Sequence, residues 1–135
     1  TKAHLTRAVM EGVAFSQTDC IEIIREMGIS VQEVRASGGG SKSPLWRQML
    51  ADCFNSEICT ISSSEGPALG AAILAGAGTG IYAGVAEGCD IAVKKKDSLA
   101  PDAANVKIYA GYYDLYRKLY PALKESFNTL AGLLK

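Results

Sequence analysis

The stretch "RASGGGSKSPLWRQML", residues 35–50, places three glycines between an apparent strand end and an apparent helix start. Ser43 is a typical N-cap residue, and Pro44 suits the first turn of a helix. Glycine loses more conformational entropy on folding than other residues, so three in a row indicate an unusual turn or a close approach to the backbone. The stretch therefore predicts a strand, a glycine turn and a helix N-terminus.

Regular elements are predicted on both sides of this turn. Apolar residues recur at helical spacing over residues 4–27, and a glycine follows as a stop signal. Residues 31–37, "VQEVRAS", and residues 57–62, "EICTIS", read as short strands. A helix from Ser43 to Asn55 joins them, so the two strands are expected to be parallel, with a right-handed crossover.

The C-terminal half is predicted to be helical apart from one loop. We expect a helix of small residues from Pro67, a shorter one over residues 85–93, and a long one from Asp102 to about Leu130. Residues 94–102, "KKKDSLAPD", are interpreted as a loop with a solvated lysine run. The last helix has an apolar stripe that we interpret as a packing surface: Val106, Tyr109, Tyr112, Tyr113, Tyr116, Leu119, Tyr120, Leu123 and Phe127.

Composition limits the classes of function. The chain has 135 residues with 14 basic and 14 acidic side chains, which suits one globular domain. The sequence lacks a basic stripe of the kind that would predict nucleic-acid binding. The longest run of small apolar residues, 68–77, is shorter than the about 20 residues that span a bilayer, so no membrane association is expected. The chain starts without Met and almost at once in a helical pattern, which we interpret as a start inside a longer protein.

The cysteine pattern predicts a reducing compartment. Cys20, Cys53, Cys59 and Cys89 form no C-x-x-C pair and have no zinc spacing. The first three lie within apolar patterns, as small hydrophobic residues do where disulfides are absent. We therefore expect a cytoplasmic protein.

The glycine turn has the chemistry of an anion site. A glycine turn that leads into a helix N-terminus directs backbone N–H groups outward, and the helix dipole favours negative charge. Two familiar phosphate motifs are absent, however. Ser41 separates Gly40 from Lys42, which breaks the P-loop pattern, and Ser43 occupies the last glycine position of the dinucleotide fingerprint. These residues leave two alternatives open: a phosphate or nucleotide site, or a tight turn that packs the helix on the strand.

Four segments together resemble one known family. They are "HLTRAVMEGVAF", residues 4–15, "GGGSKSPLWRQMLADCF", residues 38–54, "SSSEGPALGAAILAGAGTGIY", residues 62–82, and "YYDLYRKLYPALKESF", residues 112–127. In combination they resemble the C-terminal half of the FGGY family of carbohydrate kinases. The resemblance extends over nearly the whole chain.

The resemblance implies an α/β fold, the C-terminal part of an actin-like (ribonuclease H-like) ATPase domain with short parallel strands, crossover helices and a long C-terminal helix. Residues 1–135 would be a partial C-terminal, nucleotide-binding domain, without the N-terminal sugar-binding domain. In that topology residues 31–37 form an inner strand and residues 57–62 the sheet edge. Cutting such a sheet exposes unpaired strand and apolar helix surface, so we expect a homo-oligomer.

The resemblance also implies the ligands and their site. ATP or ADP, with Mg²⁺, would bind at Gly38, Gly39, Gly40, Ser41, Lys42 and Ser43, while the sugar would bind mainly to the absent domain. Glu65 and Gly66 would begin the next helix beside this turn. No catalytic residue and no metal ligand is expected in this chain, because the family's catalytic base lies upstream. None of the chain's aspartates matches it: Asp19, Asp52, Asp90, Asp97, Asp102 and Asp114.

The implied activity is ATP-dependent phosphorylation of a sugar. The resemblance is strongest to members that convert D-xylulose to D-xylulose 5-phosphate, with gluconate, ribulose and glycerol as alternative acceptors. A non-catalytic nucleotide-binding or assembly module is an alternative of another class. The isolated chain is expected to be inactive, because phosphoryl transfer needs nucleotide and acceptor positioned together.

Overall fold

The computed structural model describes residues 1–62 and 66–133. Glu65, expected at a helix entry, lies outside the described residues. The elements in chain order are α1 (Lys2–Glu26), β1 (Glu33–Ala36), a 3₁₀ helix η1 (Gly39–Lys42), α2 (Pro44–Phe54), β2 (Glu57–Ile61), α3 (Gly66–Gly78), α4 (Val85–Ala92), β3 (Lys95–Leu99) and α5 (Ala103–Leu133).

The described sheet is mixed and has the strand order β1-β2-β3. The parallel pairing of β1 with β2 is confirmed, with Val34 opposite Ile58. Two expectations are wrong. Residues 95–99 form a strand rather than a loop, and β2 is central rather than an edge strand, because β3 pairs antiparallel with its free side. β3 has no alternating apolar pattern, so its own sequence does not predict the strand, and its pairing with β2 makes it one.

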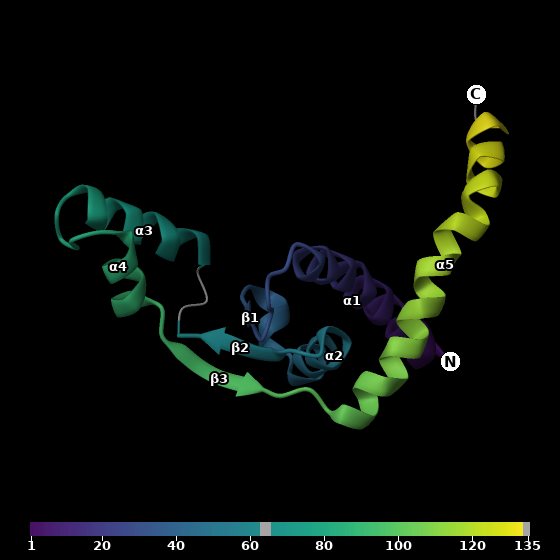
Figure 1. The fold of residues 1–135 in the computed structure, drawn as a ribbon, viewed down its shortest axis with the longest axis horizontal. Coiled ribbons are helices and arrows are strands. Elements are labelled where there is room, and N and C mark those ends of the chain that lie inside the picture. The colour runs from purple at the N-terminus through teal and green to yellow at the C-terminus, as the bar shows by residue number, and fades with distance from the viewer. Residues whose placement is uncertain (63–65, 134–135) are drawn as a thin grey trace.

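Helix α2 lies at the centre of the described structure. It packs against the sheet on one side and against α1 and α5 on the other (Figure 1). Ile58 on β2 is fully buried and belongs to the same core cluster as Phe54 on α2, Phe15 on α1 and Tyr109 on α5. Ser43 caps α2 as expected, because its hydroxyl oxygen accepts from the Trp46 N–H at 3.3 Å. The glycine turn is thus joined to the best-packed helix.

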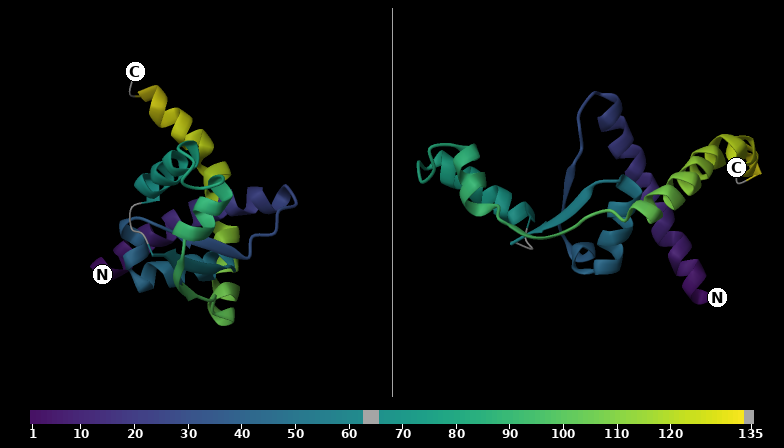
Figure 2. Two further views of the ribbon diagram at one scale, coloured as in Figure 1. Left: turned by 90° about the vertical axis from the view of Figure 1, so that its left-hand side faces the viewer. Right: turned by 60° about the horizontal axis from the view of Figure 1, so that its bottom comes forward.

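Helices α3 and α4 form a separate pair, set apart from α1, α2 and α5 (Figure 2). The ring of Tyr82 lies between Gly76 and Gly88, and a Cβ placed on either glycine would lie less than 3.0 Å from that ring. The small residues of this region therefore allow close packing of the two helices. None of the described helices combines the length and the apolar character needed to cross a membrane.

The long helix α5 uses only part of its expected packing stripe. Tyr109 is buried, and Tyr113 and Tyr116 are partly buried against the core. Further along, the stripe is exposed in the described chain, with Tyr120 at 64% and Phe127 at 49% of full exposure. The packing interpretation is confirmed for Tyr109, Tyr113 and Tyr116, whereas Tyr112 is 58% exposed.

Candidate functional site

The glycine turn follows the carboxyl end of β1, and its three glycines have different surroundings. Gly38 has φ 78° and ψ −169°, a conformation that is essentially restricted to glycine. A Cβ on Gly39 would meet no atom of residues 1–62 and 66–133 within 4 Å, so this position is open on the side of the described residues. A Cβ on Gly40 would lie 3.2 Å from the ring of Trp46. Gly38 thus has a backbone conformation that other residues rarely adopt, Gly39 is open to a ligand, and Gly40 packs against a side chain.

The hydroxyl groups of the turn stabilise its own backbone. The Ser41 hydroxyl donates to the Gly38 carbonyl at 2.7 Å, and the Ser41 N–H approaches the same oxygen at 3.3 Å. The Ser43 N–H donates to the Gly40 carbonyl at 3.1 Å. The Gly39 and Gly40 N–H groups stand at the start of η1, where a helix offers no internal acceptor. The turn is therefore held from within while its first amides remain available.

The start of α3 lies beside this turn, as expected for Gly66. A Cβ on Gly66 would lie 3.7 Å from the Ser37 hydroxyl oxygen at the end of β1. The beginnings of η1 and α3 therefore meet at the carboxyl ends of the parallel strands β1 and β2. Ligands of open α/β sheets bind in the crevice at this edge of the sheet.

A polar pocket of about 440 Å³ opens next to the turn. Two of the six expected site residues, Ser41 and Lys42, line it, whereas Gly38, Gly39, Gly40 and Ser43 are not among its lining residues. The other residues that line it come from β1, α2, β2 and β3 or their ends: Ala36, Arg47, Thr60, Ile61, Ser62, Lys96 and Asp97. Lysines and an arginine outnumber the one carboxylate, so the pocket favours an anionic ligand.

Arg47 and Asp97 form the central ion pair of this pocket. The Arg47 Nη1 lies 2.8 Å from the Asp97 Oδ1, and the Thr60 hydroxyl donates to the same oxygen. Arg47 is only 8% exposed, and its Nε has no hydrogen-bond partner among the described residues. The Thr60 hydroxyl and the Arg47 guanidinium hold the pKa of Asp97 below its ordinary value. Asp97 therefore carries the negative charge that a buried arginine needs.

Sequence reasoning missed Arg47 and the residues of β3. Arg47 stands three and seven positions before the buried Leu50 and Phe54, so a cation on an apolar helix face was a usable signal. Lys96 and Asp97 gave no signal, because a lysine run usually means a solvated turn. The segment is a strand and not a turn, although its lysines are exposed as expected, and Lys95 forms ion pairs of 2.9 Å with Glu33 and 2.7 Å with Glu57 across the sheet.

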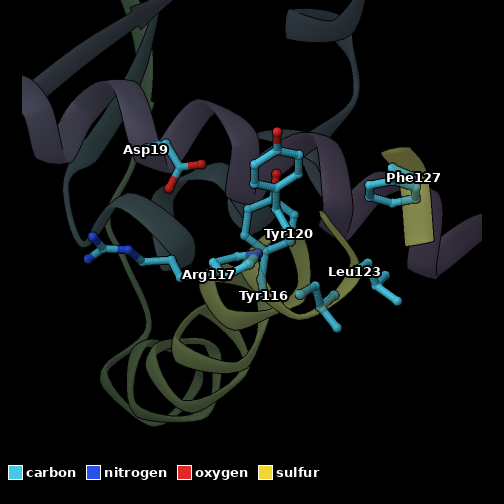
Figure 3. Close-up of a pocket in the computed structure, with 8 residues that line it drawn as sticks. Asp19, Tyr116, Arg117, Tyr120, Leu123 and Phe127 are labelled. Carbon is cyan, nitrogen blue, oxygen red and sulfur yellow. The ribbon is translucent and has the colours of Figure 1, made fainter. Parts of the chain in front are cut away.

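A larger pocket of about 570 Å³ lies between α1 and α5, away from the turn. Asp19 and Arg117 lie at one end of it and Leu123 and Phe127 at the other, with the rings of Tyr116 and Tyr120 between them (Figure 3). Its lining is mostly the exposed apolar face of α5. Within residues 1–62 and 66–133, no cluster of three or more His, Cys, Asp and Glu side chains could hold a metal ion.

Residues 1–79, which include the whole glycine turn, match the C-terminal domain of the FGGY family of carbohydrate kinases. The chain therefore belongs to this family, and its fold is part of the family's actin-like α/β domain.

Particular relatives agree with this class. The chain is 37% identical to the xylulose kinase of Bacillus subtilis (strain 168) over 134 residues, which cover 99% of the chain and 27% of that protein. The crystal structure of xylulose kinase from Rhodospirillum rubrum superposes with a TM-score of 0.80 at 29% identity, covering 95% of this chain and 26% of that one. The crystal structure of gluconate kinase from Lactobacillus acidophilus superposes with a TM-score of 0.85 at 26% identity, covering 96% of this chain and 26% of that one. The chain thus spans about a quarter of the length of its relatives.

Proposed function

We propose that this chain is the later part of the nucleotide-binding domain of a longer ATP-dependent sugar kinase. The turn Gly38–Ser43 is its contact with the phosphates or ribose of ATP and ADP. The observation that carries this proposal is the place of the turn: it ends a parallel strand, precedes a capped helix and leaves Gly39 open to a ligand. Membership of a kinase family supports the same ligand.

The basic pocket beside the turn supports an anionic ligand. Lys42 and Lys96 line it, and Asp97 is already paired with Arg47. Backbone N–H groups and lysine ammonium groups suit phosphate oxygens, whereas the described residues offer no carboxylate cluster for a divalent cation. We infer that Mg²⁺ accompanies the nucleotide phosphates.

The acceptor that fits best is D-xylulose, which the enzyme would convert to D-xylulose 5-phosphate. The support is the identity to xylulose kinases over nearly the whole chain. The similarity to a gluconate kinase structure and to a ribulokinase supports gluconate and ribulose as alternative acceptors, and glycerol is a further alternative. The catalytic base and most sugar contacts would belong to the rest of the kinase.

Because all four cysteines are free, a reducing compartment such as the cytoplasm suits the protein.

The test is a coupled assay on the full-length protein that carries this chain. With ATP and Mg²⁺, we expect the highest kcat/KM for D-xylulose within a panel that contains L-ribulose, gluconate and glycerol. The 135-residue chain alone, purified in the same way, should give no turnover. Nucleotide binding without turnover on any acceptor would favour a non-catalytic module, and absence of nucleotide binding would overturn the proposed site.

A further inference from the structure

We propose that Asp97 on β3 is a positioning residue for the nucleotide turn. It holds Arg47, and through Arg47 it holds the start of α2 and the residues Gly38–Ser43 in the geometry that receives the nucleotide. This inference rests on the proposed function of the turn. It assigns a role in shaping the nucleotide turn to a residue of a strand that lies outside that turn.

The anchor of Arg47 is the Asp97 carboxylate. Asp97 lies opposite Thr60 in the antiparallel pairing of β2 and β3, so one carboxylate oxygen receives both the Thr60 hydroxyl and the Arg47 guanidinium. The Asp97 side chain is 48% exposed, whereas the Arg47 side chain is 9% exposed. A buried guanidinium tolerates few alternative positions once its carboxylate is in place, because each alternative leaves its charge unpaired.

Short contacts connect Arg47 to the turn. The Arg47 N–H donates to the Ser43 carbonyl at 3.0 Å, and the Ser43 N–H donates to the Gly40 carbonyl at 3.1 Å. The neighbouring Trp46 packs its ring against Gly40. A shift of Arg47 therefore moves the residues that shape the turn. It also moves the wall of the pocket that Lys42 shares.

The far end of α2 has its own anchor, which provides a matched control. Asp52 accepts from the Gln48 side chain at 2.8 Å, the Asp102 N–H at 2.8 Å and the Asn105 side chain at 3.0 Å. The bonds from Asp102 and Asn105 fasten α2 to the start of α5, one to two turns beyond Arg47, whereas the Gln48 bond lies within α2. Loss of the Asn105 bond should loosen the same helix without acting directly on the turn.

The experiment compares Asp97→Ala, Asp97→Asn and Asn105→Ala with the wild type in the full-length kinase. Asp97→Ala removes the shared acceptor oxygen, whereas Asp97→Asn keeps an oxygen that can accept from both Thr60 and Arg47. We expect Asp97→Ala to raise KM and Kd for ATP roughly tenfold, within the range of couplings through packed networks. The KM for the sugar should stay within about twofold, since it binds elsewhere. Asp97→Asn should recover most of the loss, and Asn105→Ala should leave KM for ATP near the wild-type value.

A double-mutant cycle tests whether Asp97 acts through Arg47. Once Arg47→Gln has broken the anchor, adding Asp97→Ala should raise KM for ATP little further. Fully additive effects would overturn the proposal. So would equal losses for ATP and sugar, or an Asn105→Ala effect as large as that of Asp97→Ala. A wild-type kinase that binds no ATP would instead contradict the function of the turn, and the two failures are therefore distinguishable.

Discussion

The ring of Trp46 lies so close to Gly40 that a Cβ at position 40 would stand 3.2 Å from its Cδ1 and Nε1 atoms. The third glycine of the turn is thus packed tightly against a side chain of the protein itself, and its φ angle is not positive. Substitution of Gly40 would disturb Trp46 whether or not a nucleotide binds. Substitutions at the two other glycines separate effects on nucleotide binding from effects on stability. Gly39 is open on the side of the described residues, whereas Gly38 has a backbone conformation that is restricted to glycine.

Gly39→Val should weaken nucleotide binding without weakening the fold. A Cβ at this position meets no atom of the described residues within 4 Å, so the free energy of unfolding should change by less than about 0.5 kcal/mol. A bound phosphate or ribose would meet the added methyl groups, and Kd for ATP should rise at least roughly tenfold, equivalent to about 1.4 kcal/mol. Calorimetric titrations with ATP and with sugar are the measurement.

The matched control for this substitution is Gly111→Val. Gly111 is an exposed helical glycine of α5 that also has no atom within 4 Å of its Cβ position. Gly111→Val should leave the titrations with ATP and with sugar unchanged. If Gly39→Val bound ATP as the wild type does, the turn would have no direct contact with the nucleotide.

Gly38→Ala should lower the free energy of unfolding. Its φ of 78° with ψ of −169° costs a residue with a Cβ about 1–3 kcal/mol. Chemical denaturation should show this loss, while Gly39→Ala, the neighbouring control, should show almost none. An unchanged unfolding midpoint for Gly38→Ala would mean that the turn relaxes to an ordinary conformation when glycine is absent.

The ion pairs across the sheet should weaken in acid. Lys95 and Arg35, together with the Cys59 thiol, lower the pKa of Glu33 to about 2 from its ordinary 4.5. A depressed carboxyl pKa contributes stability that is present above pH 4.5 and is lost as the pH falls toward 2. The difference in unfolding midpoint between wild type and Lys95→Met should therefore shrink across this window. A difference that stayed constant down to pH 2 would show that the pairing does not contribute to stability.

The isolated chain should associate with copies of itself. Among the described residues, β1 pairs on one side only, and α1 and α5 expose large apolar side chains such as Leu5, Val9, Leu123 and Phe127. Open strand edges and apolar patches drive association. Sedimentation velocity should show species larger than a monomer that grow with concentration. Leu123→Lys with Phe127→Lys should reduce them if α5 contributes. A monomer at high concentration, with protected amides in residues 31–37, would contradict this expectation.

Local chemistry made much of this protein predictable. The serine cap and Pro44 start α2 where expected, because a capping hydroxyl and a fixed proline φ act within one turn of chain. The parallel pairing of β1 and β2 followed from the helix between them. The glycine turn was recognisable as a possible ligand site because glycine without a local folding reason is costly. These signals depend on neighbours in sequence.

The tertiary structure alone decided the third strand and the anchor of the turn. Lys95–Leu99 becomes a strand because β2 offers an unpaired edge, a condition that the lysine-rich segment does not encode. Arg47 and Asp97 are fifty positions apart, and their ion pair exists only because that strand pairing brings β3 against α2. Sequence patterns report local conformation and burial. A partner far along the chain is selected by the packing free energy of the whole fold, which also decided which charged residues were structural and which were solvated.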